Sequence, residues 1–248
     1  MKKQFFNLFK IAGKAPLLKI GVVVRPEKPA FTLSEVLITL GVIGVVAAIT
    51  MPILVKNYRQ HVLKTQFNAA VATVQNVLKL MNVENNEFVY DTYFTSDTGF
   101  GEPSMRFRRD FFKHIKGDYT KYDKNNLKTY YTFAKGSTTM AHYCPINCCN
   151  NPVINSYTGT DGIMYNVCMR ENLMVVAFDV NGYDKGPNKW GVDLFSFIIG
   201  QNDRLNGLYH ISNTGACSND SSKDNVNNGS NCGMFALIDK NYFKNLDF

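Results

Sequence analysis

The first residue that could do chemistry is Glu35, the only charged residue in an apolar run from Phe31 to Val55. The run is 25 residues long, which is enough to cross a bilayer as one helix. An isolated carboxylate in such a segment is costly and marks a functional site by default. A positive charge beside it would offset that cost.

A second polar segment, residues 179–193, could bind a calcium ion through oxygen ligands. Five of its side chains carry suitable oxygens: Asp179, Asn181, Asp184, Asn188 and Asp193. The segment is not an EF-hand, because Trp190 stands at the twelfth position, where a bidentate Glu is needed. The interpretation that we favour is a hairpin whose Asp and Asn side chains hydrogen-bond their own backbone.

Motifs of enzymes are missing from the chain. The four histidines are scattered: His61, His114, His142 and His210. The sequence contains no nucleophile elbow, phosphate-binding loop or HExxH motif. We therefore expect no enzymatic activity and, calcium aside, no cofactor.

The net charge of +7 is concentrated at the N-terminus. Residues 1–30 hold seven Lys or Arg against one acid, whereas the rest of the chain holds 20 basic and 19 acidic residues. The charge therefore gives no reason to expect nucleic-acid binding. A positive segment before an apolar helix predicts that the N-terminus lies in the cytoplasm and that residues after the helix lie outside it.

Apolar residues recur at helical spacing after Pro52, which predicts that the helix continues beyond the membrane. They are Phe67, Ala70, Val71, Val74, Val77, Leu78 and Met81. We expect one helix of 53 residues over Phe31–Val83, ended by a polar cluster at 84–87. Its membrane half is 31–55, and an amphipathic half occupies 56–85.

Residues 86–248 predict an α+β head with an antiparallel sheet. A helix is expected over Ser104–Lys116, with Met105, Phe111, Phe112 and Ile115 facing inward. Gly, Asn and Asp separate five strand-like runs: Thr129–Ala134, Ile163–Met169, Leu173–Val180, Val192–Ile199 and Leu208–Ser212. We expect Asp220–Ser230 to be mobile and the apolar run Cys232–Ile238 to form a last strand.

All six cysteines lie in the head, outside the cytoplasm in the predicted topology, where disulfides form. They are Cys144, Cys148, Cys149, Cys168, Cys217 and Cys232. Zinc is an alternative, since three of these cysteines lie close to His142. No C-x-x-C pair with a distant mate exists, however, so disulfides are favoured.

The N-terminal residues resemble the processing signal of the type IV pilins and type II secretion pseudopilins. That signal is a small residue, usually Gly, followed by Phe-Thr-Leu-x-Glu and an apolar helix. Here Ala30 stands in place of Gly, and Phe31, Thr32, Leu33 and Glu35 match. A proline at the position of Pro52 also fits the family. The resemblance is close over about residues 28–60 and covers the rest only in outline.

The resemblance implies that prepilin peptidase cuts between Ala30 and Phe31 and methylates the new amine of Phe31. Residues 1–30 would then be a leader that is removed. Glu35 would promote methylation and pair with the terminal amine of a neighbouring subunit. The other implied partners are further copies or related pilin subunits, the inner-membrane assembly platform and membrane lipid.

The resemblance bears on three further features. Cys217 and Cys232 look like the disulfide that closes the C-terminal loop of many pilins; the other four cysteines allow three pairings. Some pseudopilins carry a calcium loop in their β-region. Pro52 leaves the carbonyl of Ala48 without its helical donor, so it is either a harmless kink or a point of local unwinding during assembly.

We therefore expect the precursor of a filament subunit, held by one span in the bacterial inner membrane with its head outside the cytoplasm, and later part of a pilus or pseudopilus. The alternatives are a membrane-anchored binding module that does not polymerise, and a tethered extracytoplasmic enzyme. An ordinary secretory signal cut near Ala47 and Ala48 would explain the basic start. It would explain neither the apolar length, nor Glu35, nor Pro52.

Overall fold

The computed structural model describes residues 31–94, 102–119, 130–141, 156–170, 173–182, 184–207 and 217–246. The leader with Ala30, the predicted strand 208–212, and the cysteines at 144, 148 and 149 lie outside these ranges. The chain divides into two compact units, Met1–Ile49 and Thr50–Phe248. The predicted α+β class is confirmed, with a long apolar N-terminal helix and an antiparallel sheet.

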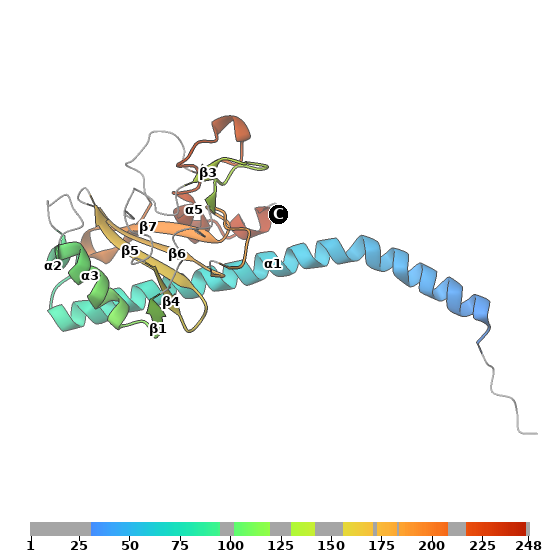
Figure 1. Ribbon diagram of the computed structural model, residues 1–248, viewed down its shortest axis with the longest axis horizontal. Helices are drawn as coiled ribbons and strands as arrows, with labels where there is room; N and C mark the ends of the chain where they lie inside the picture. The colour runs from blue at the N-terminus through green and yellow to red at the C-terminus, as the bar shows by residue number, and fades with distance from the viewer. Residues whose placement is uncertain are drawn as a thin grey trace, which may run out of the picture. The chain divides into compact units, whose positions relative to one another are not determined.

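The long helix α1 spans Leu33–Asn85 and is 53 residues long (Figure 1). It ends where Asn86 adopts a left-handed backbone conformation with φ of 54°. Its buried residues all lie in the predicted amphipathic half: Gln60, Leu63, Phe67, Ala70, Val71, Val74, Val77, Leu78 and Met81. The three- and four-residue spacing thus forms one continuous stripe, as the sequence predicts.

Six antiparallel strands form the main sheet in the order β1-β4-β5-β6-β7-β8 (Figure 1). Their bounds are Gly117–Tyr119, Ser156–Gly159, Met164–Arg170, Leu173–Asp179, Leu194–Ile199 and Leu205–Asn206. The predicted strands over 163–169, 173–180 and 192–199 correspond to β5, β6 and β7. A separate pair joins β2, Tyr130–Tyr131, to β3, Met140–Ala141, so the run predicted over 129–134 is a shorter strand.

The core of the head is an aromatic contact between α1 and strands β6 and β7. Phe178 lies opposite Phe195 in the sheet register, and Phe197 follows two residues later on the same face. Phe67 from α1 is fully buried against them, with ring centroids 4.7 Å from Phe195 and 5.9 Å from Phe178. Phe243 from the C-terminal segment completes the cluster, 5.3 Å from Phe67.

Two short helices follow α1. Helix α2, Val89–Tyr93, is capped by Asp203 from the 3-10 helix η3, Gln201–Asp203: its carboxylate accepts the N–H groups of Val89 at 3.0 Å and Tyr90 at 2.8 Å. Helix α3 spans Glu102–Lys113.

The predicted inward face of α3 is partly wrong. Phe111, Phe112 and Ile115 are buried as expected, whereas Met105 is 46% exposed. The buried stripe instead includes Ser104, Phe107 and Arg108. Met105 lies in the first turn of α3, before the aromatic residues Phe107, Phe111 and Phe112 that form most of the buried stripe.

The predicted last strand is also wrong, because Cys232–Ile238 forms helix α5. A seven-residue apolar run cannot be assigned to strand or helix from periodicity alone. Its buried residues Cys232, Gly233 and Ala236 share one helical face. Gly233 allows a close approach to β7, since an added Cβ would lie 2.8 Å from the carbonyl oxygen of Ser196.

The polar segment predicted to be mobile contains a 3-10 helix, η4 at Ser221–Lys223, and a hydrogen-bonded centre at Asp224. The Asp224 carboxylate accepts the Thr132 hydroxyl at 2.8 Å, the Ser137 hydroxyl and the Asn228 amide at 3.0 Å. These bonds join the segment to residues next to β2. A last 3-10 helix, η5 at Tyr242–Asn245, follows α5.

The aromatic contact yields the first prediction. Phe67→Ala should destabilise the head by about 3–5 kcal/mol, the usual cost of truncating a buried Phe. Urea titration of the detergent-solubilised chain would measure it, with the fluorescence of the single tryptophan, Trp190, as the probe, since that side chain is 2% exposed. The matched control is Leu80→Ala on the same helix, where the side chain is 50% exposed. Equal unfolding midpoints for the two variants would contradict the packing described.

Candidate functional site

The N-terminal end of α1 is organised around Glu35 by a capping box. Glu35 Oε2 accepts the backbone N–H of Thr32 at 2.8 Å and the Thr32 hydroxyl at 2.8 Å. In return, the backbone N–H of Glu35 donates to the Thr32 hydroxyl oxygen at 3.2 Å. These reciprocal bonds satisfy donors that the first turn of a helix otherwise leaves without partners.

The sequence interpretation missed this role of Glu35, although the signal was present. Thr32 and Glu35 have the T-x-x-E spacing of a capping box directly before an apolar run. Both bonds from Thr32 end on Oε2, which leaves Oε1 available to a second donor. The same carboxylate can therefore start the helix and still accept a cation.

Along residues 31–59, which include the first half of α1, every residue except the partly buried Ala47 is exposed. Phe31 is 85% exposed and Leu33 is 79% exposed. An added Cβ at Gly41 or Gly44 would meet nothing within 4 Å. An apolar surface this large requires a cover other than water.

This helix is long and apolar enough to cross a membrane, with a peak mean hydropathy of 2.5. None of the residues in that most apolar window is buried within the chain, unlike the core helix of a soluble domain. Pro52 lies inside α1 without ending it, so the helix continues across the position where the Ala48 carbonyl lacks a backbone donor.

The predicted Cys217–Cys232 disulfide is present, with Cα atoms 5.0 Å apart and a sequence separation of 15. It ties the chain just before the polar segment 220–230 to the first residue of α5. Cys168, on β5, is also disulfide-bonded. Its partner lies outside the described residues, as do the zinc alternative and the remaining pairings.

The proposed calcium residues are divided between a buried pair and an exposed loop. Asp179, the last residue of β6, and Asp193, the residue before β7, are both fully buried, whereas Asp184 is exposed. Asp179 Oδ1 accepts the N–H groups of Asn181 at 3.2 Å and Gly182 at 3.0 Å. These bonds are those of the favoured hairpin interpretation.

The remaining carboxylate oxygens also accept hydrogen bonds. Asp179 Oδ2 accepts the Tyr130 hydroxyl at 2.6 Å. The Asp193 oxygens accept the N–H groups of Asn188 at 2.7 Å and Lys189 at 2.6 Å. Two oxygens of the set, Asn181 Oδ1 and Asn188 Oδ1, are buried without a partner.

Among the described residues, no group of three or more His, Cys, Asp or Glu side chains is placed to hold a metal. Calcium binding therefore stays a prediction. Burial, together with the nearby negative charge of Asp179, raises the pKa of Asp193 to about 8. A proton on Asp193 relieves the repulsion between the two carboxylates, which is the task that a cation would otherwise perform.

No family model, curated protein or solved structure matches this chain.

The buried pair predicts a pH dependence of stability. At pH values between the ordinary pKa of an Asp and about 8, the folded chain keeps a proton on Asp193 that the unfolded chain has released. The free energy of unfolding should therefore fall as the pH rises through this range and level off above about pH 8. We expect Asp193→Asn to flatten this slope between pH 5 and about 8 and the exposed control Asp184→Asn to retain it. Urea titrations with a chelator present measure both.

The same titrations in millimolar calcium test the metal hypothesis, because a bound ion would hold both carboxylates ionised. The hairpin interpretation predicts no calcium effect. Stabilisation by calcium that Asp193→Asn abolishes would establish an ion site. A slope unchanged in Asp193→Asn would contradict the assigned pKa.

Proposed function

We propose that this chain is the precursor of a pilin-like filament subunit, of a type IV pilus or a type II secretion pseudopilus. Prepilin peptidase would cut between Ala30 and Phe31 and methylate the new terminus. The observation that carries the proposal is the start of α1, where Glu35 heads an exposed apolar surface of 25 residues. That surface can be covered by lipid before assembly and by other copies of α1 afterwards.

Cleavage would place an ammonium group on Phe31, four residues before Glu35. In apolar surroundings an ammonium and a carboxylate are each costly alone and offset one another when paired. Because the cap occupies Oε2, Oε1 of Glu35 would accept the terminal amine of a neighbouring subunit. Assembly would then match one charge of each subunit with the opposite charge of the next.

The driving force of assembly would be burial of the apolar half of α1 among copies of itself. Partners in this process are the other subunits, the inner-membrane assembly platform and the surrounding lipid. A structural role of this kind needs no catalytic group and no cofactor in the chain. The head would sit outside the cytoplasm, where its disulfides are stable.

The second candidate is a membrane-anchored binding module that does not polymerise. The apolar groove beside α5 favours it, since a cavity of about 480 Å³ is lined there by Leu173, Ile198, Met234 and Phe235. In-cell cross-linking separates the candidates. Filament subunits give ladders of multimers that depend on Glu35, and a lone binding module does not.

Substitutions at Glu35 separate its charge from its capping role. Gln keeps an oxygen that can complete a capping box, whereas Ala removes it. Removing one partner of a buried ion pair costs about 3–5 kcal/mol, so both Glu35→Gln and Glu35→Ala should lose nearly all filament. Thr32→Ala removes the cap alone, at a cost of about 1 kcal/mol, and should still assemble.

Sheared filaments and cross-linked ladders measure assembly, and the mass of the membrane-bound chain reports cleavage in each variant. We expect all three variants to be cleaved. Normal assembly of Glu35→Gln would contradict the ion pair and leave only capping. Accumulation of uncut precursor in Glu35→Ala would contradict the division of roles between cleavage and assembly.

A further inference from the structure

Basic residues gather where α1 leaves the apolar run. Lys56, Arg59 and Lys64 follow Val55 within three helical turns, and the chain has no acidic residue between Glu35 and Glu84. Lysine and arginine near the end of a membrane span are common anchors, so these three residues alone would indicate only the end of the span.

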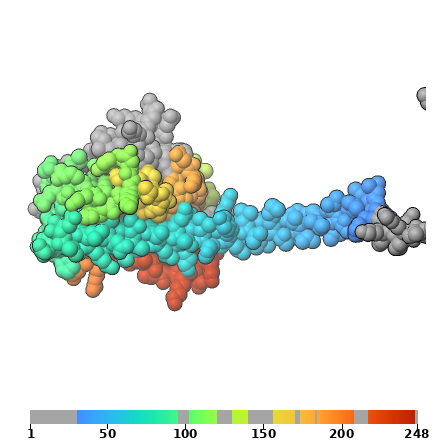
Figure 2. All heavy atoms as spheres, turned by 90° about the horizontal axis from the view of Figure 1, so that it is seen from below, coloured from blue at the N-terminus to red at the C-terminus, as the bar shows by residue number. Residues whose placement is uncertain are grey.

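The fold adds two further lysines to this position from the other end of the chain. The Gln60 side-chain amide, 7% exposed, donates to the backbone carbonyls of Lys244 and Leu246, each at 3.0 Å. Lys64 Nζ donates to the carbonyl of Lys240 at 3.4 Å. Figure 2 shows the C-terminal segment, in red, lying directly beside α1. Basic residues that only marked the end of the membrane span would not require these contacts with the C-terminal segment.

The five residues form what we call the basic collar: Lys56, Arg59, Lys64, Lys240 and Lys244. Four of them are exposed and Lys64 is half-buried. The only acid among the described residues 56–64 and 239–246 is Asp239, which accepts the N–H of Asn241 at 2.8 Å. Apolar side chains adjoin the collar on α5, where Leu237 is 40% exposed and Ile238 is 68% exposed.

The helical rise places Lys56 and Arg59 within a headgroup layer's thickness of the end of the apolar run, and Lys64 farther out. At 1.5 Å per residue, Arg59 and Lys64 lie about 6 Å and about 14 Å beyond Val55 along the axis. The headgroup layer of one leaflet is about 5–8 Å thick, and long basic side chains can reach back toward it. A surface that combines Lys and Arg with exposed apolar residues is suited to an anionic bilayer surface.

We infer that the basic collar binds anionic phospholipid headgroups while the chain is anchored, so that Lys240 and Lys244 dock the head on the bilayer. The inference rests on the membrane span alone and needs no filament. A purified chain that never polymerises can pass the test, so its failure and that of the proposed function are distinguishable.

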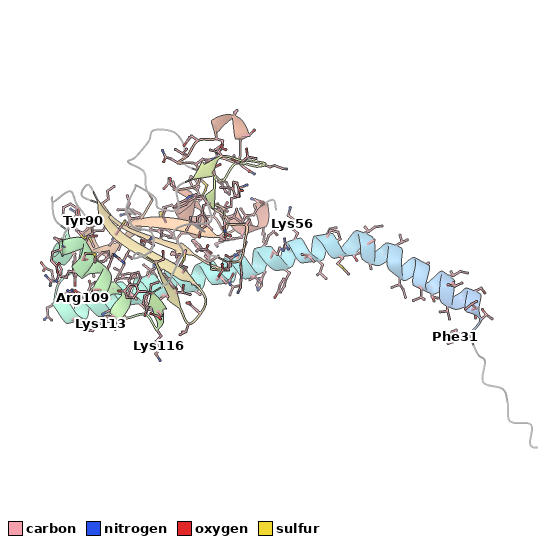
Figure 3. All side chains as sticks on the ribbon, viewed as in Figure 1. Phe31, Lys56, Tyr90, Arg109, Lys113 and Lys116 are labelled. Carbon is pink, nitrogen blue, oxygen red and sulfur yellow. A yellow bond between two sulfur atoms is a disulfide. The ribbon has the colours of Figure 1, made fainter. Side chains whose placement is uncertain are left out.

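Lysine footprinting of the full chain in vesicles tests the inference. The vesicles contain phosphatidylcholine alone or with one third phosphatidylglycerol, and a membrane-impermeant acetylating reagent labels outward-facing heads. We expect Lys240 and Lys244 to react several-fold more slowly in the anionic vesicles. About 1 M salt, where the Debye length is about 3 Å, should restore their reactivity. Lys116, exposed just before β1 (Figure 3), and Lys223 on η4 are internal controls that should not change.

A double variant provides the matched comparison. Lys240→Gln with Lys244→Gln should weaken the protection of Lys64, whereas Lys116→Gln with Lys223→Gln should leave it intact. Equal reactivity in both kinds of vesicle would overturn the inference. If protection of the collar lysines instead rose with the protein-to-lipid ratio in vesicles of phosphatidylcholine alone, the inference would be overturned. The occupant of the collar would then be a second copy of the chain.

Discussion

Packing of one stripe of α1 against the aromatic face of β6 and β7 is the interaction on which the head depends. Phe67 lies at its centre, in contact with Phe178, Phe195 and Phe243, so the helix, the sheet and the C-terminal segment share one core. The same helix exposes an apolar surface before Val55. One half of α1 thus packs into the core of the head, and the other half exposes an apolar surface suited to lipid. Lys56 is the first charged residue after the apolar run (Figure 3).

Glu35 connects the apolar surface to the proposed assembly. A carboxylate there is costly unless it has donors, and the capping box supplies two of them within the chain. Those bonds leave the charge itself unbalanced, because Thr32 contributes only neutral groups. In the proposed filament, the terminal amine of a neighbouring subunit would supply the balancing cation.

The parts of the fold that follow from periodicity could be predicted from the sequence. The length of α1, its buried stripe and strands β5, β6 and β7 are examples, because long periodic runs leave one choice. Cys232–Ile238 was misassigned because its length suits a strand or a helix. The contacts of Lys244 with Gln60 and of Lys240 with Lys64 could not be foreseen, since they join residues about 180 positions apart. Thr32 was overlooked as a cap, although its spacing to Glu35 was visible.

The central claim is that Phe31 becomes the N-terminus and that Glu35 then pairs with the terminal amine of a neighbouring subunit. The most direct test is the intact mass and N-terminal sequence of the membrane-extracted protein, from cells with and without prepilin peptidase. The account predicts a chain that begins at methylated Phe31 only when the peptidase is present. A chain that begins near Ile49, or an uncut Met1 in both strains, would contradict it.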